Sequence, residues 1–138
     1  MVDKGVFLAK VTMTEKCLKR VKAKCPTTFE EFKADADSQD VVLFNLMQAI
    51  QGCVDLAAHI VSDEGYGMAG SMQEFFELLS QQQLISTDLA GNMGKAVRFR
   101  NLIAHEYAKI DLVQVYKVAK EGISDLEQFL ATMIKKFA

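Results

Sequence analysis

The sequence predicts an all-α protein, an up-and-down bundle of about five helices. Apolar residues recur at helical spacing along most of the chain, and no segment shows the strict alternation expected of a strand. Half of the 138 residues are apolar and only one is proline. A chain of this length and composition can bury most of its apolar surface in one core, so we expect a single domain over residues 1–138.

The first half of the chain predicts two long helices and a short helical turn between them. The segment 3–24 has a helical apolar pattern and should end at Cys25-Pro26, because proline lacks an amide donor and disfavours helical geometry in the residue before it. The segment 28–31 reads Thr-Phe-Glu-Glu, a capping-box pattern that predicts a short helix. The polar stretch 35–40 is expected to be a loop that supplies the cap of the next helix. The segment 41–62 is the most strongly patterned and predicts the core helix.

The second half predicts a linker and three more helices. The segment 64–70 contains Gly-x-Gly-x-x-Gly, but the dinucleotide fingerprint needs a preceding strand, so we interpret it as a linker. Ser71 and Glu74 then form a capping-box pattern. A long helix is expected from Ser86 to Tyr107, and a last one begins after Asp111 and runs to the C-terminal lysines.

The second face of the predicted core helix carries Asn45, Gln48, Gly52, Asp55 and His59. A glycine within a helix costs roughly 1 kcal/mol relative to alanine, which close approach by another backbone would explain. Asp55 and His59 are one turn apart and therefore neighbours. A hydrogen bond at the surface or at an interface is the simpler interpretation, and a catalytic pair is the alternative. This face is a possible cleft wall or dimer contact.

The net charge of −2 gives no global basic field, so nucleic-acid binding would have to rest on a local patch such as Lys95, Arg98 and Arg100. The chain has no uninterrupted apolar run of membrane-spanning length and no signal-peptide layout, so we expect a cytoplasmic protein without a membrane partner. The three cysteines lack metal or disulfide spacing and should be reduced, with Cys53 in the core.

The most informative stretch is Arg100-Asn101-Leu102-Ile103-Ala104-His105-Glu106-Tyr107. On one continuous helix, Asn101, His105 and Tyr107 would share a side with Arg100, with Tyr107 about 20° from Arg100 in projection. Arginine binds phosphate through two parallel hydrogen bonds, and histidine can transfer protons near neutral pH. These groups suit metal-free cleavage of RNA, in which the ribose 2′-hydroxyl attacks the adjacent phosphate. His105 would move a proton, Arg100 would stabilise charge and Asn101 would orient a group.

Acid and base catalysis need two groups, and one chain supplies only one histidine in this stretch. A symmetric dimer would supply two.

Other interpretations of the stretch stay open. Arg100 could pair with a carboxylate and His105 could cap a carbonyl, both purely structural roles. The two histidines lack the spacing of a zinc site, and no Gly-x-Ser-x-Gly elbow accompanies a serine nucleophile. We therefore expect no metal and no cofactor.

The stretch matches the R-x4-H-x-Y motif of HEPN-domain proteins, and the chain resembles the HepT-like toxin family in particular. The segment 53–60 is similar to that family's second helix, and the likeness extends over roughly residues 40–137. The resemblance implies a HEPN-like bundle that dimerises through the motif helices. It also implies a toxin of a type VII-like toxin-antitoxin pair, a metal-independent endoribonuclease with tRNA as the expected substrate.

For individual residues, the resemblance implies that Arg100 and His105 are catalytic, with Asn101 supporting them. It implies that Tyr107 accepts AMP from a minimal nucleotidyltransferase antitoxin, which blocks the site by charge and bulk. Because the acidic chain does not itself attract RNA, a second function stays open: a non-catalytic helical partner, or substrate-recognition subunit, of a nucleotidyltransferase.

Overall fold

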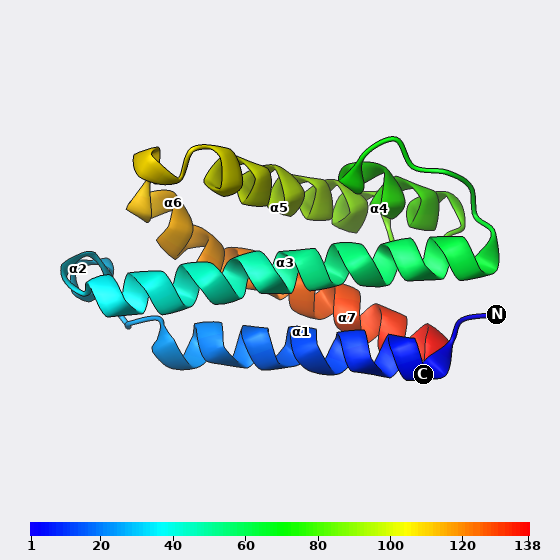
Figure 1. The fold of residues 1–138 in the computed structure, drawn as a ribbon, viewed down its shortest axis with the longest axis horizontal. Helices are drawn as coiled ribbons and strands as arrows, with labels where there is room; N and C mark the ends of the chain where they lie inside the picture. Colours follow the sequence, from blue (N-terminus) through cyan, green and yellow to red (C-terminus); the bar gives the residue numbers. More distant parts are fainter.

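The computed structural model describes all 138 residues, and they form helices and turns without a strand. In Figure 1, the long helices lie side by side along one axis, α2 closes one end of the bundle and α4 packs beside α5. The all-α prediction is confirmed. The helices are α1 (Lys4–Lys24), α2 (Phe29–Ala34), α3 (Ala36–Glu64), α4 (Met72–Gln81), α5 (Thr87–His105), α6 (Leu112–Lys117) and α7 (Ile123–Phe137).

Side-chain caps begin several of these helices, as the sequence predicted. Asp3 accepts the amide of Val6 at the start of α1. Thr28 accepts the amide of Glu31 at the start of α2, which is the first bond of the capping box, and its hydroxyl donates to the Glu31 carboxylate. Helix α4 begins after Ser71 as expected, but Ser71 makes no side-chain cap.

The prediction of a loop at residues 35–40 was wrong, because α3 begins at Ala36. The Asp35 carboxylate accepts the amides of Asp37 and Ser38 and the Ser38 hydroxyl, so this polar stretch caps and starts the helix. Polar residues are tolerated here because this first turn of α3 lies largely exposed. At the other end, Gly65 takes φ 68°, a left-handed conformation that stops α3 and starts the linker.

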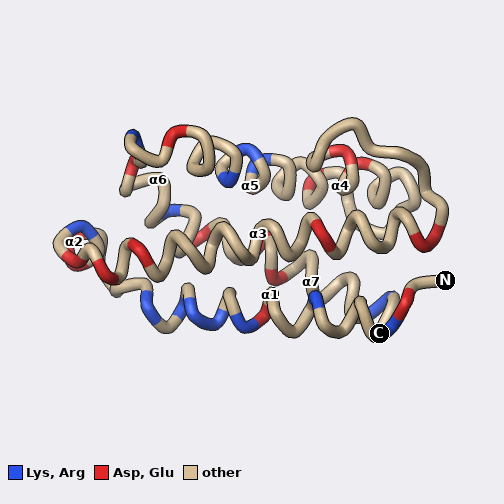
Figure 2. The backbone as a smooth tube through the Cα atoms, viewed as in Figure 1, with Lys and Arg blue, Asp and Glu red and all other residues tan.

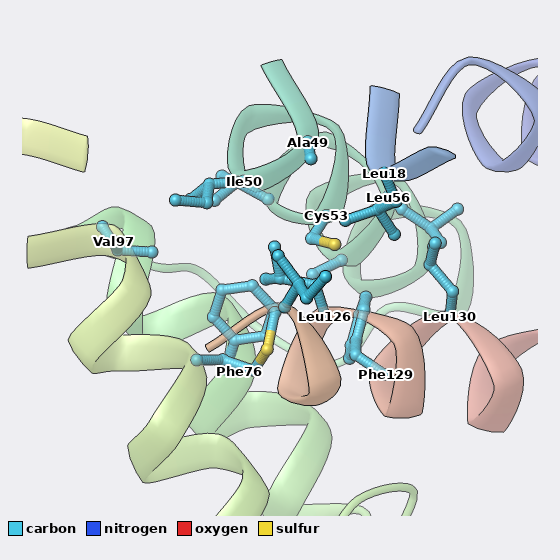
Figure 3. Packing of buried hydrophobic residues seen from close by; sticks show 14 of the residues in the cluster. Leu18, Ala49, Ile50, Cys53, Leu56, Phe76, Val97, Leu126, Phe129 and Leu130 are labelled. Carbon is cyan, nitrogen blue, oxygen red and sulfur yellow. The ribbon is translucent and has the colours of Figure 1, made fainter. Parts of the chain in front are cut away.

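Helix α3 is the core helix, as predicted. Helix α3 contacts α1, α4, α5 and α7, and Figure 3 shows its Cys53 pointing toward Leu126 of α7, with Leu56 next to Leu18 of α1. The Phe76 and Phe129 rings meet edge to face with centroids 5.2 Å apart. By length and composition α3 could cross a membrane, but 61% of its most apolar 18-residue window is buried inside the bundle. This burial makes α3 the central helix of the bundle.

Helix α1 covers the second face of α3, where the sequence placed Gly52. A Cβ added to Gly52 would overlap the Thr14 hydroxyl and lie 3.2 Å from Thr14 Cβ. Thr14 is fully buried, and its hydroxyl donates to the Lys10 carbonyl within α1. A close approach is therefore present at Gly52, but the side chain of Thr14 makes it and not the backbone that the sequence predicted.

Two predicted boundaries near the motif differ from the structure. Helix α5 ends at His105, and Tyr107 begins a short 3-10 turn, Tyr107–Lys109, because the chain reverses there to enter α6. The projection that placed Tyr107 within 20° of Arg100 on one helix therefore does not apply. The last predicted helix is also interrupted, since a π-helical segment, Val118–Gly122, joins α6 to α7. Its apolar stripe is buried as expected.

Candidate functional site: a groove beside the motif helix

A groove between the first half of α3 and the end of α5 contains part of the motif. Its volume of about 320 Å³ is near the lower end for small-molecule sites, roughly 300–1,000 Å³. Although Tyr107 is no longer on α5, it still lies with Arg100 along this groove. The lining residues are Asp40, Leu43, Phe44, Met47, Gln48, Gln51, Arg100, Ile103, Ala104 and Tyr107.

Arg100 is half-buried, and its Nη1 donates to Asn101 Oδ1 at 3.2 Å. The guanidinium takes part in none of the ion pairs of the structure. The structural role in which Arg100 pairs with a carboxylate is therefore absent from this fold. A half-buried guanidinium held by a neutral amide keeps its full charge and most of its donors free for an anion.

His105 is the last residue of α5 and is exposed, and its imidazole makes no hydrogen bond. On the regular helix it lies about 140° around the axis from Arg100, on the side of Asn101 and Leu102. Leu102 is 43% exposed, which is unusual for a large apolar residue inside a helix of the bundle. Within one chain, Arg100 faces the groove with α3 whereas His105 faces outward.

Tyr107 is 63% exposed, and its phenol hydroxyl makes no hydrogen bond within the chain. Its place in a 3-10 turn beyond α5, beside Arg100 in the groove, leaves the hydroxyl accessible to another protein. These features are those required of an acceptor for a transferred group.

Asp55 and His59 do not line this groove in the single chain, and their proposed part in a cleft wall stays a prediction. The predicted hydrogen bond between Asp55 and His59 is not formed, and His59 Nε2 instead lies 3.1 Å from Asp63 Oδ2, one turn further along α3. Asp55 Oδ1 accepts a hydrogen bond of 2.9 Å from Gln51 Nε2. Gln51 lines the groove, so Asp55 is connected to the site through this hydrogen bond. Because the Gln51 amide nitrogen donates to Asp55, the amide oxygen points away from Asp55, and it has no partner in the chain.

Sequence reasoning missed Phe44 and Gln51 as groove residues. Phe44 falls on the polar side of α3 and is 63% exposed, and an aromatic residue out of phase with the apolar stripe was the available signal. Gln51 gave no such signal. No group of three or more His, Cys, Asp or Glu side chains converges as a metal site would require. Cys53 is fully buried, and this burial raises the pKa of its thiol far above the ordinary range.

Comparisons with known proteins agree with this geometry. The family model described as "Ribonuclease HepT-like" matches residues 14–133. The mRNA nuclease HepT of Shewanella oneidensis is 32% identical over 125 residues, which span 91% of this chain and 93% of the relative.

Two solved structures have the same fold. A crystal structure of a toxin-antitoxin with AMP-PNP gives a TM-score of 0.88 at 30% identity, covering 95% of this chain and 98% of that chain. A rebuilt structure of the tri-AMPylated Shewanella oneidensis HEPN toxin in complex with MNT antitoxin gives 0.87 at 31% identity, covering 98% and 99%. The match over most of the chain, together with the motif groove, shows that this protein belongs to the HepT-like ribonuclease family.

Proposed function

We propose that this protein is the toxin of a toxin-antitoxin pair and a metal-independent endoribonuclease that acts in the cytoplasm. The observation that carries the proposal is the half-buried, unpaired Arg100 guanidinium, which shares a groove with the motif tyrosine. Transfer RNA is the first substrate to test, and messenger RNA is the second because the Shewanella relative is an mRNA nuclease.

In the proposed reaction, the ribose 2′-oxygen attacks the adjacent phosphorus while the bond from phosphorus to the 5′-oxygen breaks. One His105 takes the proton of the 2′-hydroxyl, and a second His105 donates a proton to the leaving 5′-oxygen. Arg100 stabilises the negative charge that grows on the phosphoryl oxygens, and Asn101 holds its guanidinium. The products are a 2′,3′-cyclic phosphate end and a 5′-hydroxyl end, and no metal takes part.

The second histidine comes from a second copy of the chain. The outward side of α5 carries His105 and Asn101 together with Leu102, whose exposed side chain would lose contact with water in a dimer. A two-fold axis beside this face brings both His105 side chains to one cleft. Sedimentation of the purified protein at micromolar concentration should therefore give a dimer, and a Leu102→Asp variant should shift it toward monomer and reduce cleavage.

We propose further that a minimal nucleotidyltransferase antitoxin neutralises the toxin by transferring AMP to Tyr107. The exposed phenol oxygen attacks the α-phosphate of ATP, AMP is retained on the tyrosine and pyrophosphate leaves. The AMP phosphate would then lie beside Arg100, because both residues line one groove. The modification would block RNA by occupying the phosphate-binding group and by adding negative charge.

The ribonuclease proposal is tested by incubating purified, unmodified protein with total tRNA and with mRNA in EDTA. Fragments with cyclic phosphate ends are expected, and His105→Ala and Arg100→Ala should lower kcat by about 100-fold or more. Lys135→Ala is the control, because it removes one positive charge from an exposed position of α7 outside the groove. A folded, AMP-free dimer that cuts RNA only when Mg²⁺ is added would contradict metal independence.

The modification is tested by co-expression with a minimal nucleotidyltransferase and mass spectrometry of the intact toxin. We expect AMP-sized additions on the peptide that contains Tyr107, and none on that peptide in Tyr107→Phe. The unmodified Tyr107→Phe variant should keep its ribonuclease activity, and co-expression should no longer suppress it. AMP additions confined to other peptides would overturn the role of Tyr107.

The alternative function is a non-catalytic helical partner of a nucleotidyltransferase. The observation that favours it is that no histidine lines the groove that contains Arg100 within one chain. A folded, unmodified dimer that binds the nucleotidyltransferase but leaves both RNA classes intact would establish this function in place of the ribonuclease.

A further inference from the structure

We propose that a second groove, between α1 and the start of α3, binds the part of the RNA that extends beyond the cleavage site. In this RNA track, Lys16 and Arg20 bind phosphates and Phe44 stacks on a base. The inference rests on the proposed ribonuclease function and deepens it, because it assigns residues to RNA binding away from the bond that is cut. The groove is lined by Met13, Lys16, Cys17, Arg20, Asp40, Val41, Phe44 and Asn45.

The two grooves are continuous. Asp40 and Phe44 line both the α1/α3 groove and the motif groove that contains Arg100. Both residues are on the exposed ridge of α3, one helical turn apart, so the grooves lie on opposite flanks of this ridge. An RNA strand with its scissile phosphate at Arg100 can therefore cross the ridge at Phe44 and enter the α1/α3 groove.

The cations of this groove are available for phosphate. Lys16 and Arg20 are one turn apart on the same face of α1, both are exposed, and neither belongs to an ion pair. Figure 2 shows the basic residues gathered along the half of α1 that leads to α2. Spaced cations along a groove are the electrostatic feature of proteins that bind single-stranded nucleic acid.

The opposite flank of α1 has a different charge balance. There Lys19 and Lys22 line a groove together with Glu15 and Glu127, and Lys22 Nζ lies 2.6 Å from the Glu127 carboxylate. The two cations and two carboxylates of that groove cancel. Of the two grooves that α1 borders, only the one that leads to the motif groove has an excess of cations over carboxylates, and the other provides a matched control.

Phe44 is suited to stacking. Its side chain is 63% exposed and takes part in none of the aromatic pairs inside the protein. An exposed phenylalanine between two grooves gains nothing from the core, whereas an unpaired base offers it a flat face. Stacking of one base on an aromatic side chain contributes roughly 1–3 kcal/mol by alanine substitution, or about 5- to 150-fold in affinity.

Asp40 is the unfavourable group in the track. Its carboxylate lines both grooves and repels phosphate. The proposal therefore predicts that Asp40→Asn binds RNA more tightly than the parent chain. A gain in affinity is a sharp test, because loss of folding cannot produce it.

The experiment measures binding of a fluorescein-labelled single-stranded RNA oligonucleotide by anisotropy, on dimers carrying His105→Ala so that the RNA stays intact. Adding Lys16→Gln and Arg20→Gln should weaken binding and reduce the slope of log affinity against log salt by about 1.4, roughly 0.7 per lost phosphate contact. Phe44→Leu should weaken binding about 5-fold or more without a change in that slope. The control pair Lys19→Gln and Lys22→Gln changes the net charge equally and should leave binding close to that of the parent.

Each outcome decides between the proposals. If the control pair weakens binding as much as Lys16→Gln with Arg20→Gln, only net charge matters and the track is wrong. If Phe44→Leu dissociates the dimer in sedimentation, Phe44 belongs to a subunit contact and its stacking role is wrong. RNA cleavage by the unmutated chain, with binding unaffected by the track substitutions, would overturn the track and leave the ribonuclease intact. RNA binding that depends on the track residues, without any cleavage by the unmutated chain, would support the track and overturn the ribonuclease proposal.

A native reporter gives an independent check. Cys17 lines the track, whereas Cys25, which is equally half-buried on α1's C-terminal cap, does not. Bound RNA should slow alkylation of Cys17 by iodoacetamide and leave the rate at Cys25 unchanged, as measured by mass spectrometry of the two peptides. Equal rates at Cys17 with and without saturating RNA would show that the strand leaves the motif groove by another route.

Discussion

The Arg100 guanidinium donates from Nη1 to Asn101 Oδ1 at 3.2 Å, so the cation that we propose as catalytic is positioned by its neighbour in the chain. Asn101→Ala removes this acceptor. A single hydrogen bond contributes roughly 1 kcal/mol net, so kcat/KM should fall by about 3- to 10-fold, much less than in Arg100→Ala. Steady-state cleavage of RNA by the two variants measures the difference.

Asn101→Asp sharpens this test. The carboxylate can still accept the bond, but it neutralises Arg100 and repels the phosphate, so this variant should lose more activity than Asn101→Ala. If the aspartate variant instead matches the parent, Asn101 holds the guanidinium only by geometry and the charge of Arg100 is not used in the reaction.

A second prediction concerns the pair Gln51 and Asp55. Asp55 fixes the Gln51 amide through a 2.9 Å bond, and Gln51 lines the groove with an amide oxygen that has no partner. Asp55→Ala should reduce cleavage by about 3-fold, the effect of one lost positioning bond. The same substitution in a Gln51→Leu background should have no further effect, because its effect passes through Gln51. Additive losses in the double variant would instead give Asp55 a separate role.

The sequence predicted the helices, their order and most of the core, because a helical apolar stripe and a helix cap are local patterns. The helix boundaries that were predicted wrongly depend on contacts and chain directions that the local sequence pattern does not specify. Asp35 is a cap only because its carboxylate meets the amides of the next turn, and a polar stretch by itself cannot distinguish a loop from an exposed first turn. The end of α5 at His105 follows from the reversal of the chain into α6.

The site was predicted in part. The motif identified Arg100, Asn101, His105 and Tyr107 as functional candidates, but the structure brings only Arg100 and Tyr107 to one groove of the single chain. More than half of the groove's lining residues come from α3, and their contribution depends on how α3 and α5 cross. No local pattern encodes this crossing, so the position of Phe44 on the polar side of α3 marked it as unusual but could not place it beside Arg100.

A third prediction concerns pH. The Ser38 hydroxyl, followed by the Ser38 and Asp37 amides, donates to Asp35 and holds the pKa of this carboxyl below its ordinary value. A lowered folded-state pKa means that the stabilisation is present above about pH 4, the unfolded value, and is lost as pH falls through the folded pKa. The parent chain should therefore unfold at a higher temperature than Asp35→Asn near neutral pH, and this difference should shrink in strong acid. Thermal unfolding followed by circular dichroism measures it, and a difference that stays constant over that pH range would contradict the cap's charge dependence.

The last prediction concerns the contact of α1 with α3 at Gly52. Alanine there gains helix propensity of roughly 1 kcal/mol, but its methyl group overlaps the buried Thr14 hydroxyl, and overpacking costs about 1–3 kcal/mol. We expect a net loss of up to about 2 kcal/mol in the free energy of unfolding, measured by urea titration. Thr14→Ala in the same chain should recover part of this loss, because it removes the overlapping oxygen and leaves only the Cβ contact at 3.2 Å. Alanine at the exposed Gly91, which has nothing within 4 Å of an added Cβ, should instead stabilise the chain and serves as the control. If Gly52→Ala stabilises the protein as much as Gly91→Ala, the two helices can separate at no cost, and the close approach does not determine how α1 packs on α3.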